Sequence, residues 1–157
     1  MQITLMRASN QRMVHDARSL ARHMRNVRRL ASEGSFKMQQ PVNFAEKLSK
    51  CNDHWAPRVI AEMNTYQFKL VKFQGEFVWH RHTETDEVFI VLNGEMEIAF
   101  HDEAITVRAG EMFVIPKNRE HITRARSECH ALLVEPRGVL NTGNTGGKLT
   151  AQSDVWV

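Results

Sequence analysis

Residues 75–94 read GEFVWHRHTETDEVFIVLNG, and this stretch decides how the rest of the chain is interpreted. His80 and His82 are separated by one residue, and Glu87 follows five residues later. Side chains alternate between the two faces of a β-strand, so an extended segment would project both imidazoles to one side, about 7 Å apart along the strand. Glu87 opens the next apolar segment, where an adjacent antiparallel strand would bring its carboxylate to the same side. The stretch predicts three metal ligands that converge on one point.

A fourth ligand is expected from residues 110–121, which read GEMFVIPKNREH. Gly110 and Pro116 bracket a short apolar segment, and His121 follows a few residues later. Neutral imidazole nitrogens together with one carboxylate suit divalent iron, manganese, nickel, copper or zinc.

The second half of the chain has an all-β pattern. From Tyr66 onward, turn residues separate short segments rich in β-formers: YQFKLVKF, EFVWHRH, EVFIVL, EMEIAF, AITV, EMFVIP, HITRAR and HALLVEP. Asn93-Gly94 predicts a two-residue hairpin between EVFIVL and EMEIAF, because a type I′ turn needs positive φ at both central residues. Further turns are expected at residues 101–103 and 109–110.

These features resemble the cupin superfamily. Its first motif is glycine, His-x-His, glutamate and glycine, and its second is glycine, proline, a turn glycine and histidine. The matching residues of this chain are Gly75, His80, His82, Glu87 and Gly94 for the first motif, and Gly110, Pro116 and His121 for the second. The spacer from Gly75 to His80 is one residue shorter than the commonest form. Asn118 occupies the turn-glycine position, where asparagine is the residue that best replaces glycine at positive φ.

The resemblance covers roughly residues 66–136 and implies a double-stranded β-helix, or jelly-roll barrel. It also implies a metal held inside the barrel by His80, His82, Glu87 and His121, and often a homodimer. PVNFAEKLS, which follows Met38, and EPRGVLNTG near the C-terminus resemble segments of small bacterial cupins without an assigned activity. We therefore expect an N-terminal arm at 38–64, a barrel at 65–137 and a C-terminal loop and tail at 138–157.

Residues 1–37 form a basic N-terminal extension, with eight Lys/Arg against two Asp/Glu. Apolar residues recur there at steps of four and three, which predicts an amphipathic helix. It is a targeting or membrane-surface helix, a helix docked on the domain or a partner, or translated upstream sequence. The last reading is favoured, because Glu33-Gly34 must be encoded by a purine-rich run that resembles a bacterial ribosome-binding site shortly before Met38.

The remaining residues carry thirteen Lys/Arg against sixteen Asp/Glu. They therefore lack the excess of positive charge that binds a nucleic-acid backbone. No apolar run reaches membrane-spanning length. Cys51 and Cys129 form no CxxC pair and are expected to be small buried side chains in a reducing, cytoplasmic setting. The tail GVLNTGNTGGKLT lacks the spacing of a phosphate loop and is expected to be a surface loop.

For several other polar and aromatic residues, packing or solvent exposure competes with a role in the functional site. Ordinary packing is the favoured interpretation for the pair His54-Trp55, and for Phe89, Val91 and Thr123, which share faces with the predicted ligands. Solvated or rim positions are expected for Glu84, Asp86, His101 and His130, whereas His15 and His23 belong to the extension.

Four protein ligands would leave two positions of an octahedral metal open for a small molecule. This indicates a small-molecule metalloenzyme, of dioxygenase type with iron, or of isomerase or lyase type with zinc, manganese or nickel. The alternative is a non-enzymatic cupin that binds a small ligand and uses the metal structurally.

Overall fold

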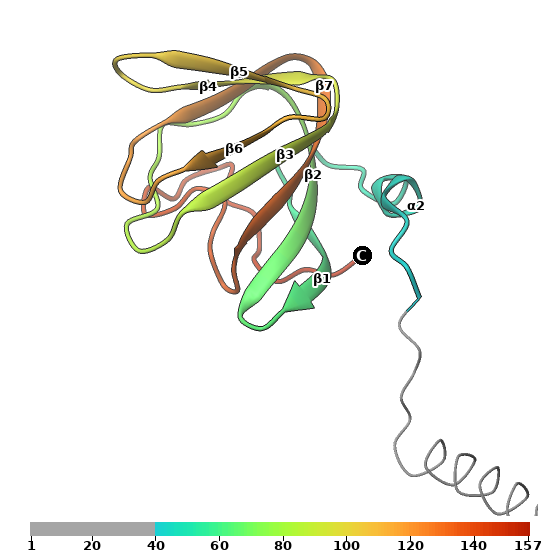
Figure 1. The fold of residues 1–157 in the computed structure, drawn as a ribbon. Helices are drawn as coiled ribbons and strands as arrows, with labels where there is room; N and C mark the ends of the chain where they lie inside the picture. The colour runs from blue at the N-terminus through green and yellow to red at the C-terminus, as the bar shows by residue number, and fades with distance from the viewer. Residues whose placement is uncertain (1–39) are drawn as a thin grey trace, which may run out of the picture. The chain divides into compact units, whose positions relative to one another are not determined.

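We describe residues 40–157 in a computed structural model (Figure 1). The predicted extension 1–37, with His15 and His23, lies outside these residues. The described elements are one short helix and seven strands: α2 (Phe44–Leu48), β1 (Arg58–Met63), β2 (Tyr66–Glu76), β3 (Glu87–Asn93), β4 (Glu95–Ala99), β5 (Ala104–Arg108), β6 (Met112–Ile115) and β7 (Ile122–Pro136). No helix among them is long and apolar enough to cross a membrane. The all-β prediction is confirmed.

All strand pairs are antiparallel, and β7 lies at the centre of their arrangement. The order of the main path is β1-β2-β7-β3-β6, and β4 pairs with both β5 and β7. The 15 residues of β7 therefore contact β2 on one side and, in turn, β4 and β3 on the other. The sequence split this strand into two segments, which was wrong, because the polar residues Arg126, Ser127 and Glu128 mark an exposed stretch of a continuous strand.

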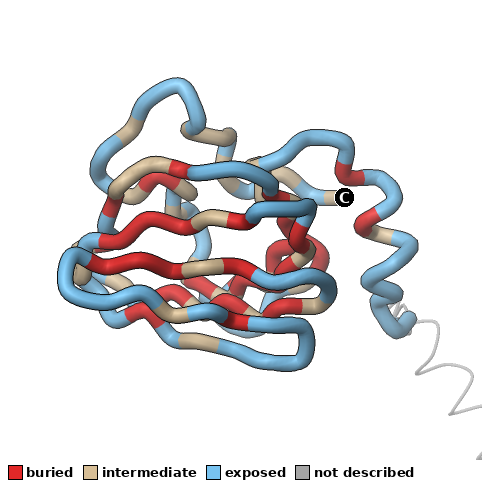
Figure 2. Tube along the Cα trace, turned by 90° about the horizontal axis from the view of Figure 1, so that it is seen from above, coloured by how far each residue is buried: buried red, intermediate tan, exposed pale blue. Residues whose placement is uncertain are grey.

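Alternation along the strands separates two hydrophobic clusters. Inward-facing side chains such as Val71, Phe73 and Phe89 form the larger cluster inside the barrel. Outward-facing Leu70 and Leu132 pack with Leu48 of α2 in a second cluster. Figure 2 shows the buried positions concentrated along the strands, with the connecting turns exposed. The barrel interior is therefore where a side chain can be removed from water.

The chain does not form the hairpin predicted at Asn93-Gly94. β3 and β4 do not pair with each other; both pair with β7, as successive segments of one bent path. Gly94 has φ 78°, but Asn93 keeps an ordinary negative φ, so no type I′ turn forms. A Cβ on Gly94 would lie 3.0 Å from the carbonyl oxygen of Glu128. Glycine is needed here for the close approach to β7.

The other turn predictions are confirmed. β4 and β5 pair up to Ala99 and Ala104, which places a hairpin turn at 101–103. Gly110 has φ 89°, and Asn118 has φ 63°. Asn118 therefore adopts the left-handed conformation expected at the turn-glycine position.

Candidate metal centre

Backbone hydrogen bonds hold the two predicted ligand segments together. β2 ends at Glu76, which is the first residue of the predicted strand EFVWHRH, so that strand does not form and the prediction was wrong. His80 and His121 form an isolated antiparallel bridge, in which each N–H donates to the other carbonyl at 2.9 Å. The N–H of Asn118 donates to the carbonyl of His82 at 2.6 Å. The His-x-His segment is therefore fixed against the segment that carries His121.

Two backbone carbonyls set the orientation of two imidazole rings. His80 Nδ1 lies 2.9 Å from the carbonyl oxygen of Val78, and His121 Nδ1 lies 3.0 Å from that of Arg119. A carbonyl only accepts hydrogen bonds, so each Nδ1 carries the proton and donates it. Each Nε2 is then left with a free lone pair, which is the form that binds metal.

Glu87 lies between two of the rings. Its Oε2 is 3.5 Å from His82 Nε2 and 3.5 Å from His121 Nε2. These separations are long for hydrogen bonds, and all three atoms are buried without a hydrogen-bond partner. Buried polar atoms are rarely left in this state unless a water or an ion completes them.

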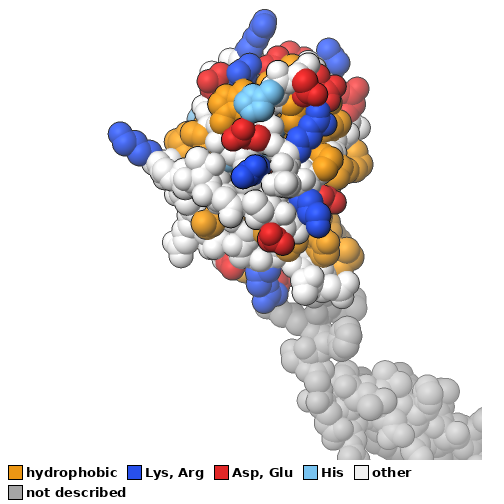
Figure 3. Space-filling model, turned by 90° about the vertical axis from the view of Figure 1, so that its left-hand side faces the viewer, with side chains coloured by type: hydrophobic (Ala, Val, Ile, Leu, Met, Phe, Trp, Pro, Cys, Tyr) orange, Lys and Arg blue, Asp and Glu red, His pale blue; other side chains and the backbone are white. Residues whose placement is uncertain are grey.

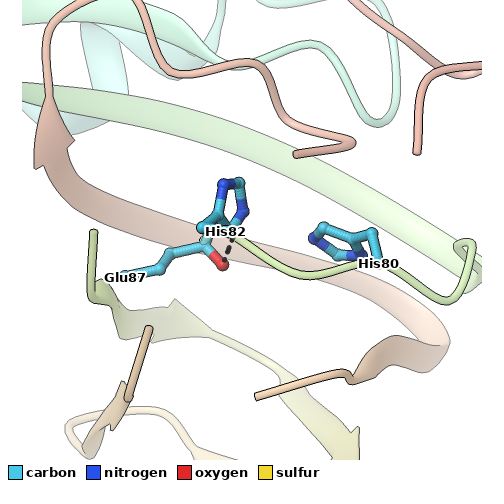
Figure 4. Close-up of side chains that lie close together, drawn as sticks. All are labelled: His80, His82 and Glu87. Carbon is cyan, nitrogen blue, oxygen red and sulfur yellow. Dashed lines mark ion pairs between the residues drawn. The ribbon is translucent and has the colours of Figure 1, made fainter. Parts of the chain in front are cut away.

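The predicted four residues are brought together by the fold. The ligand atoms of His80, His82 and Glu87 lie within 4.8 Å of one another, and all three side chains are buried. Figure 4 shows His82 and Glu87 directed toward each other, with His80 beside them. The ring of His121 lies 4.3 Å from the ring of His80, measured between centroids. Glu87 enters from the start of β3, and the histidines enter from the two bridged segments.

Burial and mutual charge set the protonation of this cluster. Burial, reinforced by the neighbouring His121, lowers the pKa of His80 to about 4, so this ring is neutral at pH 7. Burial also lowers the pKa of His82, but the adjacent Glu87 carboxylate outweighs it and the net shift is upward. For Glu87 the penalty of burial is overcome by His121 and His82, which lower its pKa. The cluster thus holds an ionised carboxylate beside imidazole nitrogens.

The donor set fits a divalent transition metal. Ligand nitrogens and oxygens lie about 2.1 Å from such ions, so two ligands on one ion are roughly 3 to 3.5 Å apart. The two 3.5 Å separations around Glu87 are close to this range. Three imidazoles and one carboxylate also match the preferences of iron, manganese, zinc and nickel in proteins.

A small cavity inside the barrel opens onto two of these residues. Its polar lining includes His80, Glu87 and Thr123, and most of its other walls are apolar or aromatic. Phe89 is one of the aromatic walls, whereas Val91 belongs to the packed core. The cavity measures about 30 Å³, which is room for one or two water molecules.

A buried ion pair lies deeper in the same barrel. Lys69 Nζ donates to Glu135 Oε1 at 2.9 Å, and both side chains are almost completely buried. Burial and the charge of Glu87 raise the pKa of Glu135 to about 7. Glu135 Oε2 and Gln67 Oε1 have no hydrogen-bond partner, and these two residues are paired across the β2–β7 ladder.

The C-terminal tail braces the loop that carries His82. The N–H of Asn144 donates to the carbonyl of Arg81, and a Cβ on Gly143 would lie only 2.2 Å from that oxygen. Thr142 is fully buried. The tail is a loop without a phosphate-binding geometry, but it packs on the candidate site more closely than the predicted surface loop would.

The other polar residues singled out in the sequence lie away from the cluster. His101 is exposed, bonds to Glu120 at 2.9 Å and stacks on Trp79. Glu84 and Asp86 are exposed, and Asp86 accepts a hydrogen bond from the N–H of Lys117. His130 is partly buried and bonds to Glu128. These solvated or rim positions are as predicted.

Both cysteines are free and buried, as expected. Burial raises the pKa of the Cys129 thiol to about 12 and also raises that of Cys51. Burial therefore disfavours the thiolate form of both residues, which agrees with the expected packing role.

Trp55 has a closer relation to the cavity than the sequence indicated. It was expected to pack within a loop, and it does stack on Phe73 and Phe77, but it also forms a wall of the cavity that reaches His80. No spacing pattern links it to the histidines, so only the fold reveals this position.

A larger depression of about 420 Å³ lies over β4, β5 and β7 and is lined by none of the four predicted ligands. Four of its five charged residues form pairs: Arg124 contacts Glu97 at 3.0 Å and Arg108 contacts Glu95 at 3.7 Å. Figure 3 likewise shows basic and acidic side chains interspersed over one face of the molecule. The buried cluster is therefore the better candidate for chemistry.

Comparisons with known proteins agree with this architecture. A family model described as "Cupin domain" matches residues 69–135. The crystal structure of a cupin-2 domain containing protein from Shewanella frigidimarina is 61% identical, with a TM-score of 0.60, over 61% of this chain and 94% of that one. A structure of a protein from Neisseria meningitidis is 34% identical, with a TM-score of 0.58, over 62% of this chain and 99% of that one.

One curated relative is also similar: the uncharacterized protein YdbB of Bacillus subtilis is 36% identical over 100 residues, which are 63% of this chain and 86% of that protein. The similarity extends across nearly the whole length of these relatives, and the antiparallel fold agrees with the predicted jelly-roll barrel. The chain belongs to the cupin family.

Proposed function

We propose that the barrel binds one divalent transition metal ion through His80, His82, Glu87 and His121. The observation that carries this proposal is the convergence of three buried ligand atoms without hydrogen-bond partners: His82 Nε2, Glu87 Oε2 and His121 Nε2. A cluster left in this state without an ion would be costly, because each unpaired buried polar atom destabilises the fold by about 1–3 kcal/mol.

The proposed role is that of a small-molecule metalloenzyme. A bound ion would supply Lewis-acid chemistry, or dioxygen chemistry if it is iron. The chain itself supplies an apolar cavity beside His80 and Glu87, which excludes bulk water, and the Thr123 side chain, which is positioned to contact a ligand there. The reaction is of dioxygenase type or of isomerase or lyase type.

The alternative is a ligand-binding cupin without catalysis, in which the metal stabilises the barrel. The small volume of the cavity, about 30 Å³, favours this alternative, because it does not admit an organic substrate without rearrangement. Turnover of a small molecule that depends on the metal would distinguish the enzyme from the binding protein.

We also propose that the protein forms a homodimer through the outer face of the main sheet. Two rows of side chains cross this face in register: Val114, Val88, Val134, Phe68 and Ala61 in one, and Met112, Ile90, Leu132, Leu70 and Arg58 in the other. Leu132 and Leu70 are covered by Leu48 of α2, so the free part of the face is the apolar first row together with Met112 and Ile90. Met112 and Val114, on the edge strand β6, are 58% and 43% exposed. An apolar patch of this kind matches a second copy of itself, and sheets commonly pack face to face.

The metal proposal is tested by elemental analysis of protein purified without chelator or a metal-affinity tag. Wild type should contain close to one ion per chain. Losing even an outer-shell partner weakens metal binding roughly 10–100-fold, so His80→Ala or His121→Ala should lose the ion. His101→Ala is the matched control, because this exposed histidine lies outside the cluster, and it should retain the metal. Equal metal content in all three variants would contradict the ligand assignment.

A further inference from the structure

One wall of the cavity beside the candidate metal centre is a tryptophan that does not belong to any strand. Trp55 lies between α2 and β1 and is partly exposed. Its indole stacks on Phe77, with ring centroids 4.8 Å apart, and on Phe73, at 5.2 Å. Part of the indole therefore lines the cavity that reaches His80 and Glu87, and part of it is accessible to solvent.

The backbone of Trp55 is held in an unusual conformation. Its φ is 61°, in the left-handed region that bulky residues rarely adopt. The N–H donates to the carbonyl of Lys72 at 2.9 Å, and the carbonyl accepts from Asn141 Nδ2 at 2.9 Å. Asn141 also bonds to Leu149 and Ala151, so the C-terminal tail fixes this position. Strained conformations that the surroundings hold in place cluster at ligand sites.

The size of the cavity shows what this arrangement does. With the indole seated, about 30 Å³ remains in front of His80 and Glu87, which is room for one or two water molecules or a ligand of similar size. The slot that the indole occupies, against Phe73 and Phe77, would accept a planar aromatic ring if the indole were absent.

We propose that Trp55 determines the size of the ligands that reach the metal centre. Seated on Phe73 and Phe77, it admits molecules of two or three heavy atoms and excludes five-membered or larger rings. This inference rests on the proposed metal function. It adds a specificity-determining residue that is not a proposed metal ligand and lies far from the ligand histidines in the sequence.

The test is a titration of the full chain loaded with cobalt(II), followed by visible absorption, with azide as the small probe and imidazole as the ring probe. Azide should bind wild type and all variants alike. Imidazole should bind Trp55→Ala at least about tenfold more tightly than wild type, because steric misfit in an enclosed pocket is worth such factors. Trp55→Phe should lie between them, and it preserves the test if the alanine variant does not fold. Trp156→Ala removes a largely exposed tryptophan as the matched control and should behave like wild type.

A second measurement is independent of metal. In metal-free protein, indole should raise the melting temperature of Trp55→Ala by refilling the slot, but not that of wild type or Trp156→Ala. Equal imidazole affinity in wild type and the Trp55 variants would overturn the inference, as would the lack of any effect of indole on Trp55→Ala. Failure of every variant to bind cobalt would instead overturn the metal proposal, and the indole measurement would still decide the role of Trp55.

Discussion

The histidines of the candidate centre are oriented by the backbone around them. Val78 and Arg119 each lie two residues before a histidine. The backbone carbonyl of each accepts a hydrogen bond from the Nδ1–H of that histidine. This contact can form in an extended segment whatever the identity of those two residues. The two Nε2 lone pairs are therefore directed inward by the path of the chain, and the local sequence needs to specify only the imidazoles.

The pH dependence of stability should report the burial of His80. Its pKa is lowered from 6.5 to about 4 in the folded protein. Between these values the unfolded chain binds a proton that the folded chain does not, so the metal-free protein loses stability as the pH falls from 6.5 toward 4. At about 1.4 kcal/mol per pKa unit, the loss is at most about 3 kcal/mol. Urea unfolding of metal-free protein at pH 4.5 and pH 7 measures it.

His80→Gln removes this titration while keeping a polar side chain of similar length. Its free energy of unfolding should therefore depend less on pH than that of wild type over the same interval. The comparison between the two proteins cancels the contribution of His82, whose raised pKa acts with the opposite sign. Identical pH dependence in both proteins would show that His80 is not held neutral by burial.

The identity of the four clustered residues was predictable, whereas the wall around them was not. His80, His82 and Glu87 lie close together in sequence, so the alternation of an extended chain constrains where they point. His121 was found by its motif. Trp55 joins the cavity through positive φ and through Asn141, which lies 86 positions away, and no local pattern encodes such a contact.

Among the secondary-structure elements, the predicted hairpin was wrong because the same local sequence is compatible with two backbone structures. Asn93-Gly94 is typical of a tight hairpin, but the positive φ of Gly94 equally suits a bend in a path that continues along β7. Which of the two forms depends on the distant strand β7, because it offers a ladder to β3 and β4 together. The strands β3 to β6 and the turns at 101–103 and 110 depend on local patterns and were predictable.

The contact between the C-terminal tail and the His82 loop should be sensitive to a single methyl group. Gly143→Ala places a Cβ against the carbonyl of Arg81 at a position with φ 52°, so the tail or the loop must move. The free energy of unfolding should fall by more than about 2 kcal/mol, the range of strongly destabilising substitutions. Thermal and denaturant unfolding measure the change.

Gly146→Ala is the control for this prediction. Its φ of 67° is similarly positive, but nothing lies within 4 Å of an added Cβ. It should cost only the conformational penalty, about 1 kcal/mol. If the two variants are equally stable, the tail does not press on the loop as the structure indicates.

For the whole molecule, the outer sheet face makes the oligomeric state testable. Val114→Lys places a charge within the proposed interface, on the edge strand β6 and opposite Val88 in its own chain. Because a buried unpaired charge is costly, the dimer should dissociate at micromolar concentration. Light scattering after gel filtration would give the mass of the monomer. Leu149→Lys alters an apolar residue of similar exposure in the tail and should leave the dimer intact; a monomeric wild type would contradict the proposal.

The central position of β7 also has a consequence for synthesis of the chain. β2, β3 and β4 all pair with residues 122–136, which leave the ribosome after every one of the predicted ligands. Until then these strands have unpaired edges, and such edges are prone to aggregation. The barrel therefore closes only after residues 122–136 have been made, and until then the nascent chain exposes its histidines before it has a pocket to select among metal ions.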